Sequence, residues 1–124
     1  MTIENAYRAY TVLNNISSKT MPAKTAYKVS KLCSALKGDA EFYTERLTQI
    51  IDQYGEKDDK GEPIINGNGC SIQKDKVDDC ANAIKELREI EATVVDIKIN
   101  LSELENIELS PNDIAAIYDF IEED

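Results

Sequence analysis

Four lysines in the first third of the chain have the spacing best suited to binding a ligand. Lys24, Lys28 and Lys31 stand at i, i+4 and i+7, so on a helix they share one face, and Lys19 lies just ahead of them. A row of ammonium groups can hold phosphates or other anions. Lys19, Lys24, Lys28 and Lys31 are therefore candidates for binding a small anionic molecule. The alternative is that they form the solvated outer face of a helix.

The chain contains no histidine, which limits the chemistry that it can perform. Histidine is the commonest general base and a usual ligand of zinc and iron. Cys33, Cys70 and Cys80 are an odd number without a C-x-x-C pair, so we expect free thiols in a reducing compartment. The acidic turn at residues 56–61 fails as a calcium loop, because Lys60 takes a ligand position and no glutamate closes the loop. We predict that the protein is not an enzyme and holds no metal and no cofactor.

The net charge of −10 is unevenly distributed along the 124 residues. Residues 1–54 carry seven Lys/Arg against five Asp/Glu, whereas residues 55–124 carry seven against nineteen. An acidic second half repels the phosphates of DNA and RNA, so nucleic acid is an unfavourable partner. Such a surface can also imitate nucleic acid or keep a protein in solution. No apolar run approaches the roughly 18 residues that cross a bilayer, so no membrane partner is expected.

Residues 22–54 carry the most regular apolar pattern and predict one long helix. Pro22 suits the first turn, and apolar residues then recur at alternating spacings of three and four, a heptad seam as in a coiled coil. Such a helix is about 50 Å long, and Gly38 weakens its middle by about 1 kcal/mol relative to alanine. The seam consists of Ala26, Val29, Cys33, Leu36, Ala40, Tyr43, Leu47, Ile50 and Tyr54. Of these, we expect Val29, Leu36, Tyr43, Leu47, Ile50 and Tyr54 to line the core or an oligomer interface.

Three shorter helices are predicted at residues 2–17, 75–91 and 111–121. Each has apolar residues three and four positions apart, which places them on one face. Thr2 can cap the first helix. Ser110 can cap the last, with proline at the first helical position and a carboxylate at the third.

Three strands complete the predicted elements. Residues 62–65 and 70–73 flank an Asn-Gly-Asn-Gly turn and predict a hairpin. Residues 93–101 alternate apolar and polar side chains and predict a strand, which would join the hairpin or a copy of itself in another subunit. The predicted fold class is α+β, mainly α, in a single domain of residues 1–124. In it, a long heptad-patterned helix is packed by two shorter helices, a small antiparallel β-sheet or hairpin and a C-terminal helix.

Four blocks of sequence resemble a known family. They are residues 22–31 (PAKTAYKVSK), 53–58 (QYGEKD), 101–105 (LSELE) and 109–113 (LSPND). In this order they resemble a family of small phage and prophage proteins of unknown function from Gram-positive bacteria. The resemblance implies a viral gene product that acts in the host bacterial cytoplasm or in the virion, and it supplies no catalytic or binding residues.

These observations favour a phage accessory protein that binds and neutralises a host factor. The factor would be a defence protein or a small anionic signalling molecule, the latter held by the lysine row. The alternative is a structural protein of virion assembly, such as a tail accessory factor, because long heptad helices and self-pairing strands suit that role equally well. An enzyme would have to rely on tyrosine, lysine, aspartate or cysteine without the support of histidine.

The heptad seam also predicts a homo-oligomer, most simply a dimer. The helix at 75–91 can cover the seam from residue 40 to 54 and the first helix can cover residues 26–36, but a partner subunit can cover the same stripe. Native mass spectrometry tests the prediction, with a multiple of 13.9 kDa as the expected result. A single species of 13.9 kDa would contradict it.

Overall fold

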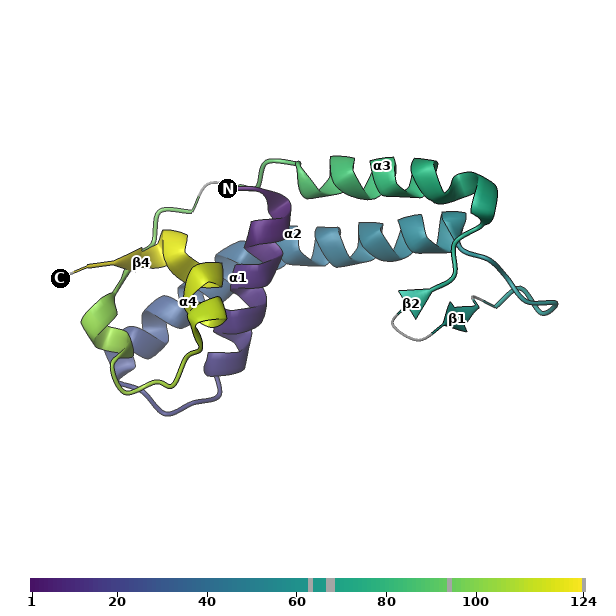
Figure 1. The fold of residues 1–124 in the computed structure, drawn as a ribbon. Helices are drawn as coiled ribbons and strands as arrows, with labels where there is room; N and C mark the ends of the chain where they lie inside the picture. Colours follow the sequence, from purple (N-terminus) through teal and green to yellow (C-terminus); the bar gives the residue numbers. More distant parts are fainter. Residues whose placement is uncertain (63, 67–68, 94, 124) are drawn as a thin grey trace.

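One long helix, α2 (Ala23–Tyr54), is the spine of the protein in a computed structural model, which describes residues 1–62, 64–66, 69–93 and 95–123 (Figure 1). Its 32 residues run unbroken through Gly38, which confirms the predicted helix at 22–54. It ends at Tyr54 and is followed by Gly55, where a Cβ atom would lie 2.6 Å from the carbonyl oxygen of Ile51. The helix therefore stops before a position that has no room for a side chain.

The N-terminal half of α2 is covered by α1 (Ile3–Ile16), which crosses it steeply (Figure 1). The side chain of Thr2 caps α1, as predicted, by accepting a hydrogen bond from the amide of Asn5 at 3.3 Å. Two small buried residues, Ala6 and Ala9, let the helix backbones approach closely. The larger side chains that fill this core are Leu13, Ile16, Val29, Leu32 and Leu36.

The C-terminal half of α2 is covered by a different helix, α3 (Val77–Arg88), which follows a short 3₁₀ turn, η1 (Lys74–Lys76). The two helices run side by side and antiparallel, forming a two-helix arm of residues 40–54 and 77–88 that projects from the rest of the molecule (Figure 1). A second cluster of buried residues fills the arm and its base: Ile3, Tyr43, Ile50, Cys80 and Leu87.

The predicted heptad seam is therefore covered within one chain. Its positions Val29, Leu36, Ala40, Tyr43 and Ile50 are buried, and Cys33, Leu47 and Tyr54 are half-buried, whereas Ala26 is exposed. Because α1 and α3 supply this cover, the seam does not require a partner subunit. The coiled-coil and homo-oligomer interpretations remain predictions.

The end of the arm carries a hairpin of β1 (Ile65–Asn66) and β2 (Gly69–Cys70), which pair antiparallel (Figure 1). The observed strands are thus shorter than the predicted strands at 62–65 and 70–73, and they lie closer to the turn. Residues 63 and 67–68, which belong to the first predicted strand and to the turn, lie outside the described residues.

The prediction of a strand over residues 93–101 is wrong for most of its length. Only β3 (Ile99–Asn100) is a strand, and it pairs in parallel with β4 (Ile121–Glu122), with Ile99 opposite Ile121. The expected small antiparallel β-sheet or hairpin is confirmed only as the hairpin of β1 and β2, because the sheet of β3 and β4 is parallel and separate from it. Residue 94 lies outside the described residues.

The apolar alternation in this segment has another physical cause. Val95, Ile97 and Ile99 pack into the main core, while Asp96 and Lys98 are exposed. An extended chain places successive side chains on opposite sides whether or not it has a strand beside it. The alternation therefore records an extended segment lying on the helices.

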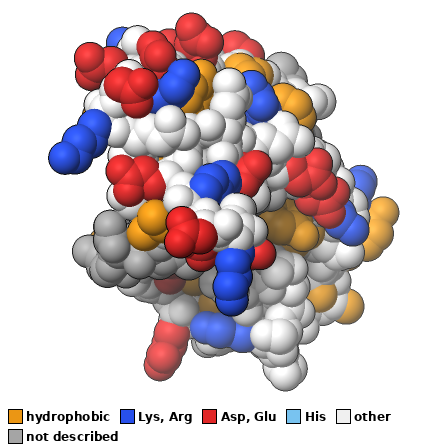
Figure 2. Space-filling view, turned by 90° about the vertical axis from the view of Figure 1, so that its right-hand side faces the viewer, with side chains coloured by type: hydrophobic (Ala, Val, Ile, Leu, Met, Phe, Trp, Pro, Cys, Tyr) orange, Lys and Arg blue, Asp and Glu red, His pale blue; other side chains and the backbone are white. Residues whose placement is uncertain are grey.

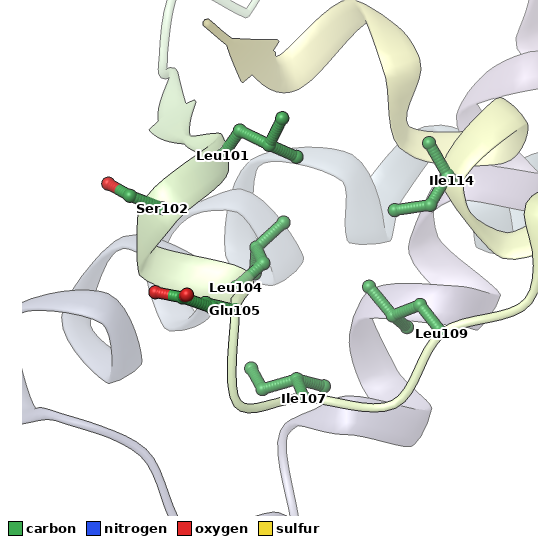
Figure 3. Close-up of a pocket in the computed structure, with 7 residues that line it drawn as sticks. All are labelled: Leu101, Ser102, Leu104, Glu105, Ile107, Leu109 and Ile114. Atoms are coloured by element: carbon green, nitrogen blue, oxygen red, sulfur yellow. The ribbon is translucent and has the colours of Figure 1, made fainter. Parts of the chain in front are cut away.

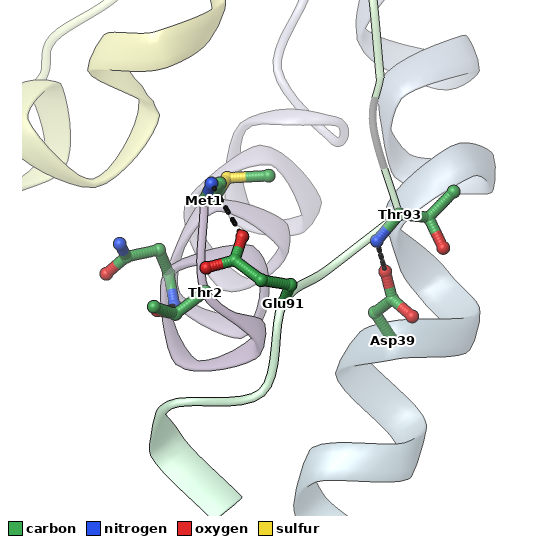
Figure 4. A network of polar contacts seen from close by, with 6 residues as sticks. Met1, Thr2, Asp39, Glu91 and Thr93 are labelled. Atoms are coloured by element: carbon green, nitrogen blue, oxygen red, sulfur yellow. Dashed lines mark hydrogen bonds and ion pairs between the residues drawn. The ribbon is translucent and has the colours of Figure 1, made fainter.

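A short network joins the base of the arm to the rest of the fold (Figure 4). Thr2 and Glu91 form an antiparallel bridge, and the amino group of Met1 lies 3.5 Å from a carboxylate oxygen of Glu91. On the other side, the amide of Thr93 donates to the carboxylate of Asp39 in α2 at 2.9 Å. The segment after α3 is thereby held between the start of α1 and the middle of α2.

The C-terminal region consists of short elements. They are η2 (Leu101–Leu104), α4 (Pro111–Ile117), the 3₁₀ turn η3 (Tyr118–Phe120) and then β4. The predicted capping box is confirmed: the Ser110 hydroxyl accepts from the Asp113 amide at 3.1 Å, and the Asp113 carboxylate accepts from the Ser110 amide at 3.2 Å. The predicted helix at 111–121 ends early, because β4 turns away to pair with β3.

Gly38 offers a test of how α2 is stabilised. A Cβ atom there meets no heavy atom within 4 Å, so Gly38→Ala should raise the free energy of unfolding by about 0.5–1 kcal/mol through helix propensity alone. Gly61→Ala is the matched control. Its φ of +79° disfavours a side chain, so the same change should lower stability by about 1 kcal/mol. Urea denaturation measures both, and a destabilised Gly38→Ala variant would contradict the account of an open helix face.

Candidate functional site

A partly buried ion pair connects η2 to the first turns of α2. The ammonium of Lys28 lies 2.7 Å from one carboxylate oxygen of Glu103, and the hydroxyl of Thr25 donates to the other at 3.1 Å. Only 14% of the Glu103 side chain and 23% of the Lys28 side chain are exposed, and Thr25 is fully buried. The three side chains join segments that are 75 residues apart in the sequence.

This environment favours the charged form of Glu103. The hydrogen bond from Lys28 is the main reason that the pKa of Glu103 lies below its usual value. The hydrogen bond from Thr25, the positive charge of Lys28 and a backbone hydrogen bond at Asn100 lower the pKa further, while partial burial opposes them. Glu103 is therefore an ionised structural group that is already bonded inside the chain.

The four lysines predicted to bind an anion do not form a free row. Lys28 is the partner of Glu103. Lys19 donates to the backbone carbonyl of Glu108 at 3.3 Å, and the ammonium of Lys31 lies 5.3 Å from the centre of the Tyr27 ring. Lys24 is exposed and lines a cavity of about 290 Å³ together with Glu103. A ligand bound by all four lysines would have to displace these contacts.

An apolar cavity of about 410 Å³ lies between η2 and α4 (Figure 3). Figure 3 shows its apolar side chains pointing toward a common space, with Ser102 and Glu105 at one margin, directed away from it. Leu104, at 4% exposure, forms the floor, whereas Leu101, at 45%, stands at the mouth. In a 3₁₀ helix residues i and i+3 share a face, so these two leucines point the same way. The apolar lining is Leu101, Leu104, Ile107, Leu109 and Ile114. We call this the η2–α4 cavity.

The η2–α4 cavity lies in the most one-sidedly charged part of the chain. Between residues 99 and 123 the sequence has seven Asp/Glu and no Lys/Arg. Five of these seven acidic residues are exposed, including Glu105 and Glu108, and neither of those two has an ion-pair partner within 4.0 Å among the described residues. The cavity therefore combines exposed apolar area with carboxylates that form no ion pair among the described residues, although the ammonium of Lys19 reaches the backbone carbonyl of Glu108.

A second, more polar cavity of about 520 Å³ separates α1 from α4. Arg8 lies on its rim but is engaged with Glu4 at 3.2 Å, and Glu4 also pairs with Arg88 at 2.8 Å. The lining residues are Asn5, Tyr7, Arg8, Thr11, Val12, Asn112, Ala115, Ala116 and Asp119. Its polar groups differ in sign and type, so they define no single class of ligand.

Cys33 and Cys80 lie in environments that disfavour the thiolate form. Cys80 is buried and Cys33 is half-buried, and burial raises the pKa of both thiols. A raised pKa lowers the fraction of nucleophilic thiolate. The side chain of Cys70 lies outside the described part of the structure. Within that described part, no group of three or more His, Cys, Asp or Glu side chains comes close enough together to hold a metal ion.

The face at the end of the arm is also acidic (Figure 2). Acidic side chains gather along its upper rim, over α3, with a few lysines or arginines and small apolar areas between them.

None of the helices described here is both long and apolar enough to cross a membrane.

Sequence reasoning did not identify Glu103 or the η2–α4 cavity. The sequence did contain a signal for the cavity. Apolar residues recur three positions apart at 101, 104 and 107, and the stretch that follows contains no cation. Nothing local to Glu103 indicates that Lys28 will meet it.

The ion pair predicts a pH-dependent stability. Glu103→Gln should lower the free energy of unfolding by about 1 kcal/mol near pH 7, a modest figure because the pair is partly exposed. Because the pKa of Glu103 is lowered in the folded state, its stabilisation is fully present above the usual value of about 4.3 and is lost as the pH falls through the lowered pKa. The difference between wild type and variant should therefore shrink below about pH 4.

Urea denaturation at a series of pH values measures this difference. Glu105→Gln is the matched control, since this exposed neighbour has no ion pair within the described residues and should change stability by less than about 0.5 kcal/mol. A difference for Glu103→Gln that stays constant from neutral to acidic pH would show that the lost charge is not its cause.

Comparison of the chain with protein-family models, with curated proteins and with solved structures found no match. The resemblance to phage and prophage proteins therefore remains a prediction. The function is argued below from the geometry of the chain itself.

Proposed function

We propose that this chain is a non-catalytic binding protein, encoded by a phage, that attaches to a host protein in the bacterial cytoplasm and blocks it. The observation that carries the proposal is the η2–α4 cavity, an open apolar surface in a stretch with carboxylates and no cation. Exposed apolar area beside charge of one sign is typical of protein interaction surfaces. The phage origin rests on the resemblance of four sequence blocks, and the absence of histidine from the sequence supports a role without catalysis.

A host protein is a better partner than a small anionic molecule. Three of the four candidate lysines already have contacts within the chain: Lys28 with Glu103, Lys19 with a carbonyl and Lys31 with an aromatic ring. A phosphate would have to compete with the partly buried carboxylate of Glu103 for Lys28. This cost supports the protein partner.

A role in virion assembly is the second candidate function, and the two-helix arm is the observation in its favour. The arm projects from the rest of the molecule (Figure 1) and leaves Leu47 and Tyr54 half-buried along its seam. Phe42 on α2 is 48% exposed. A projecting helical pair with apolar edges could join subunits in a larger assembly.

An infection experiment separates these functions. The tagged chain would be produced in bacterial strains that each carry one phage-defence system, and the strains would then be infected. We expect plaques to be restored in a strain whose defence protein is retained by the chain at a stoichiometric ratio. The double variant Lys24→Ala/Lys31→Ala is the matched control and should restore plaques equally well, because the proposal gives these exposed lysines no role.

Two further measurements can contradict the proposal. Stoichiometric presence of the chain in purified virions, without any restored infection, would assign it to assembly. An ultraviolet spectrum of the retrieved chain with a nucleotide contribution, together with failure of the double variant, would assign it to a small anionic ligand.

A further inference from the structure

We propose that the η2–α4 cavity docks a short segment of a partner protein that combines large apolar side chains with flanking lysine or arginine. This inference rests on the proposed function, since it names the surface and the class of partner through which binding takes place. Its support comes from the shape of the cavity, its charge and the poor fit of the alternative occupant.

The apolar part of the segment fits the interior of the cavity. At about 410 Å³ the cavity falls within the size range of binding pockets. Its floor is the buried Leu104, and Leu101 at the mouth leaves nearly half of its surface in water. Covering this surface is favourable because apolar area leaves water. The side chains in Figure 3 converge on the space that one or more apolar side chains of a partner would fill.

The basic part of the segment fits the margin. Glu105 lies at the margin of the cavity with its exposed side chain directed away from the apolar space (Figure 3), and Glu108 lies between the two lining residues Ile107 and Leu109. Lys19 reaches the carbonyl of Glu108, so the Glu105 side is where a cation from a partner meets the least opposition. A lysine or arginine placed there would gain a charge-assisted hydrogen bond with a carboxylate that has no ion-pair partner among the described residues.

A second copy of this chain that docks through this same surface is a poor occupant. It would bring the same stretch, residues 99–123, with seven acidic residues and no basic one. Juxtaposed like charges disfavour association. Charge complementarity therefore selects a basic partner over self-association at this surface.

Selection from a random-peptide library displayed on particles tests the proposal with the full-length chain as bait. We expect the enriched peptides to carry a net positive charge together with leucine, isoleucine, phenylalanine or tryptophan. Binding of the enriched peptides, measured by fluorescence anisotropy, should weaken at least about tenfold for Leu101→Gln, which removes the apolar mouth, and for Glu105→Lys, which reverses the rim charge. Both positions are exposed, so both variants should keep the fold, and circular dichroism checks this.

Two matched control variants carry the same chemical changes elsewhere. Phe42→Gln replaces an apolar side chain of similar exposure on α2, and Glu45→Lys reverses an exposed charge on the same helix. Each should change peptide binding by less than about twofold if the cavity is the site. An equal loss for Glu45→Lys would mean that the peptides respond to the overall negative charge, and an equal loss for Phe42→Gln would mean that they do not need the cavity; either result would make the proposal wrong.

Three other outcomes would overturn it. They are enrichment of neutral or acidic peptides, no enrichment at all, and a concentration-dependent dimer, seen by sedimentation, that Leu101→Gln abolishes. The last would assign the cavity to a second copy. The peptide assay needs no infected cell, so the two experiments can fail separately. If no peptide binds but infection is restored, the blocking role holds and must use another surface of the chain. Peptide binding without restored infection leaves the cavity assigned and the blocking role refuted.

Discussion

The apolar stripe of α2 has to be covered along about 50 Å, and no other helix of the described chain is long enough to do this alone. The stripe is therefore divided between α1 and α3, which pack on its two halves around separate clusters of buried side chains. The connection between the halves is the segment that pairs with Thr2 and is held by Asp39. Once α1 and α3 occupy these positions, the C-terminal elements can pack only where α1 and the start of α2 remain uncovered.

Much of this arrangement could be predicted from the sequence because its signals are local. The spacing of apolar residues gave the long helix from Ala23 to Tyr54, and the caps at Thr2 and Ser110 gave the starts of two further helices. A cap needs only a side chain and an amide three residues later, so a few consecutive residues determine it. Gly38 did not break α2, since packing of the apolar face outweighs a propensity cost of about 1 kcal/mol.

What could not be predicted depends on which segments meet. The alternation of Val95, Ile97 and Ile99 shows that one side of an extended segment is buried, but it does not identify the neighbouring surface, which proved to be helical. The candidate site shows the same limit. In the sequence, Lys28 belongs to a row of lysines on one helix face. Only the tertiary fold brings Glu103, 75 residues away, into contact with it. Spacing along one helix therefore predicted a ligand where the chain supplies its own carboxylate.

The same ion pair holds η2, which forms one wall of the cavity between η2 and α4. Because η2 is a single 3₁₀ turn, fixing Glu103 against the start of α2 fixes the rotation of the whole turn about its axis. Leu104 is then directed into the core, and Leu101, three residues earlier on the same face, is held above it at the surface. α4 has only seven residues and leads directly into β4, so it cannot extend to cover Leu101. Under the proposed function, the lysine that the sequence offered as an anion ligand would contribute to binding indirectly, through the ion pair that holds η2 beside the cavity.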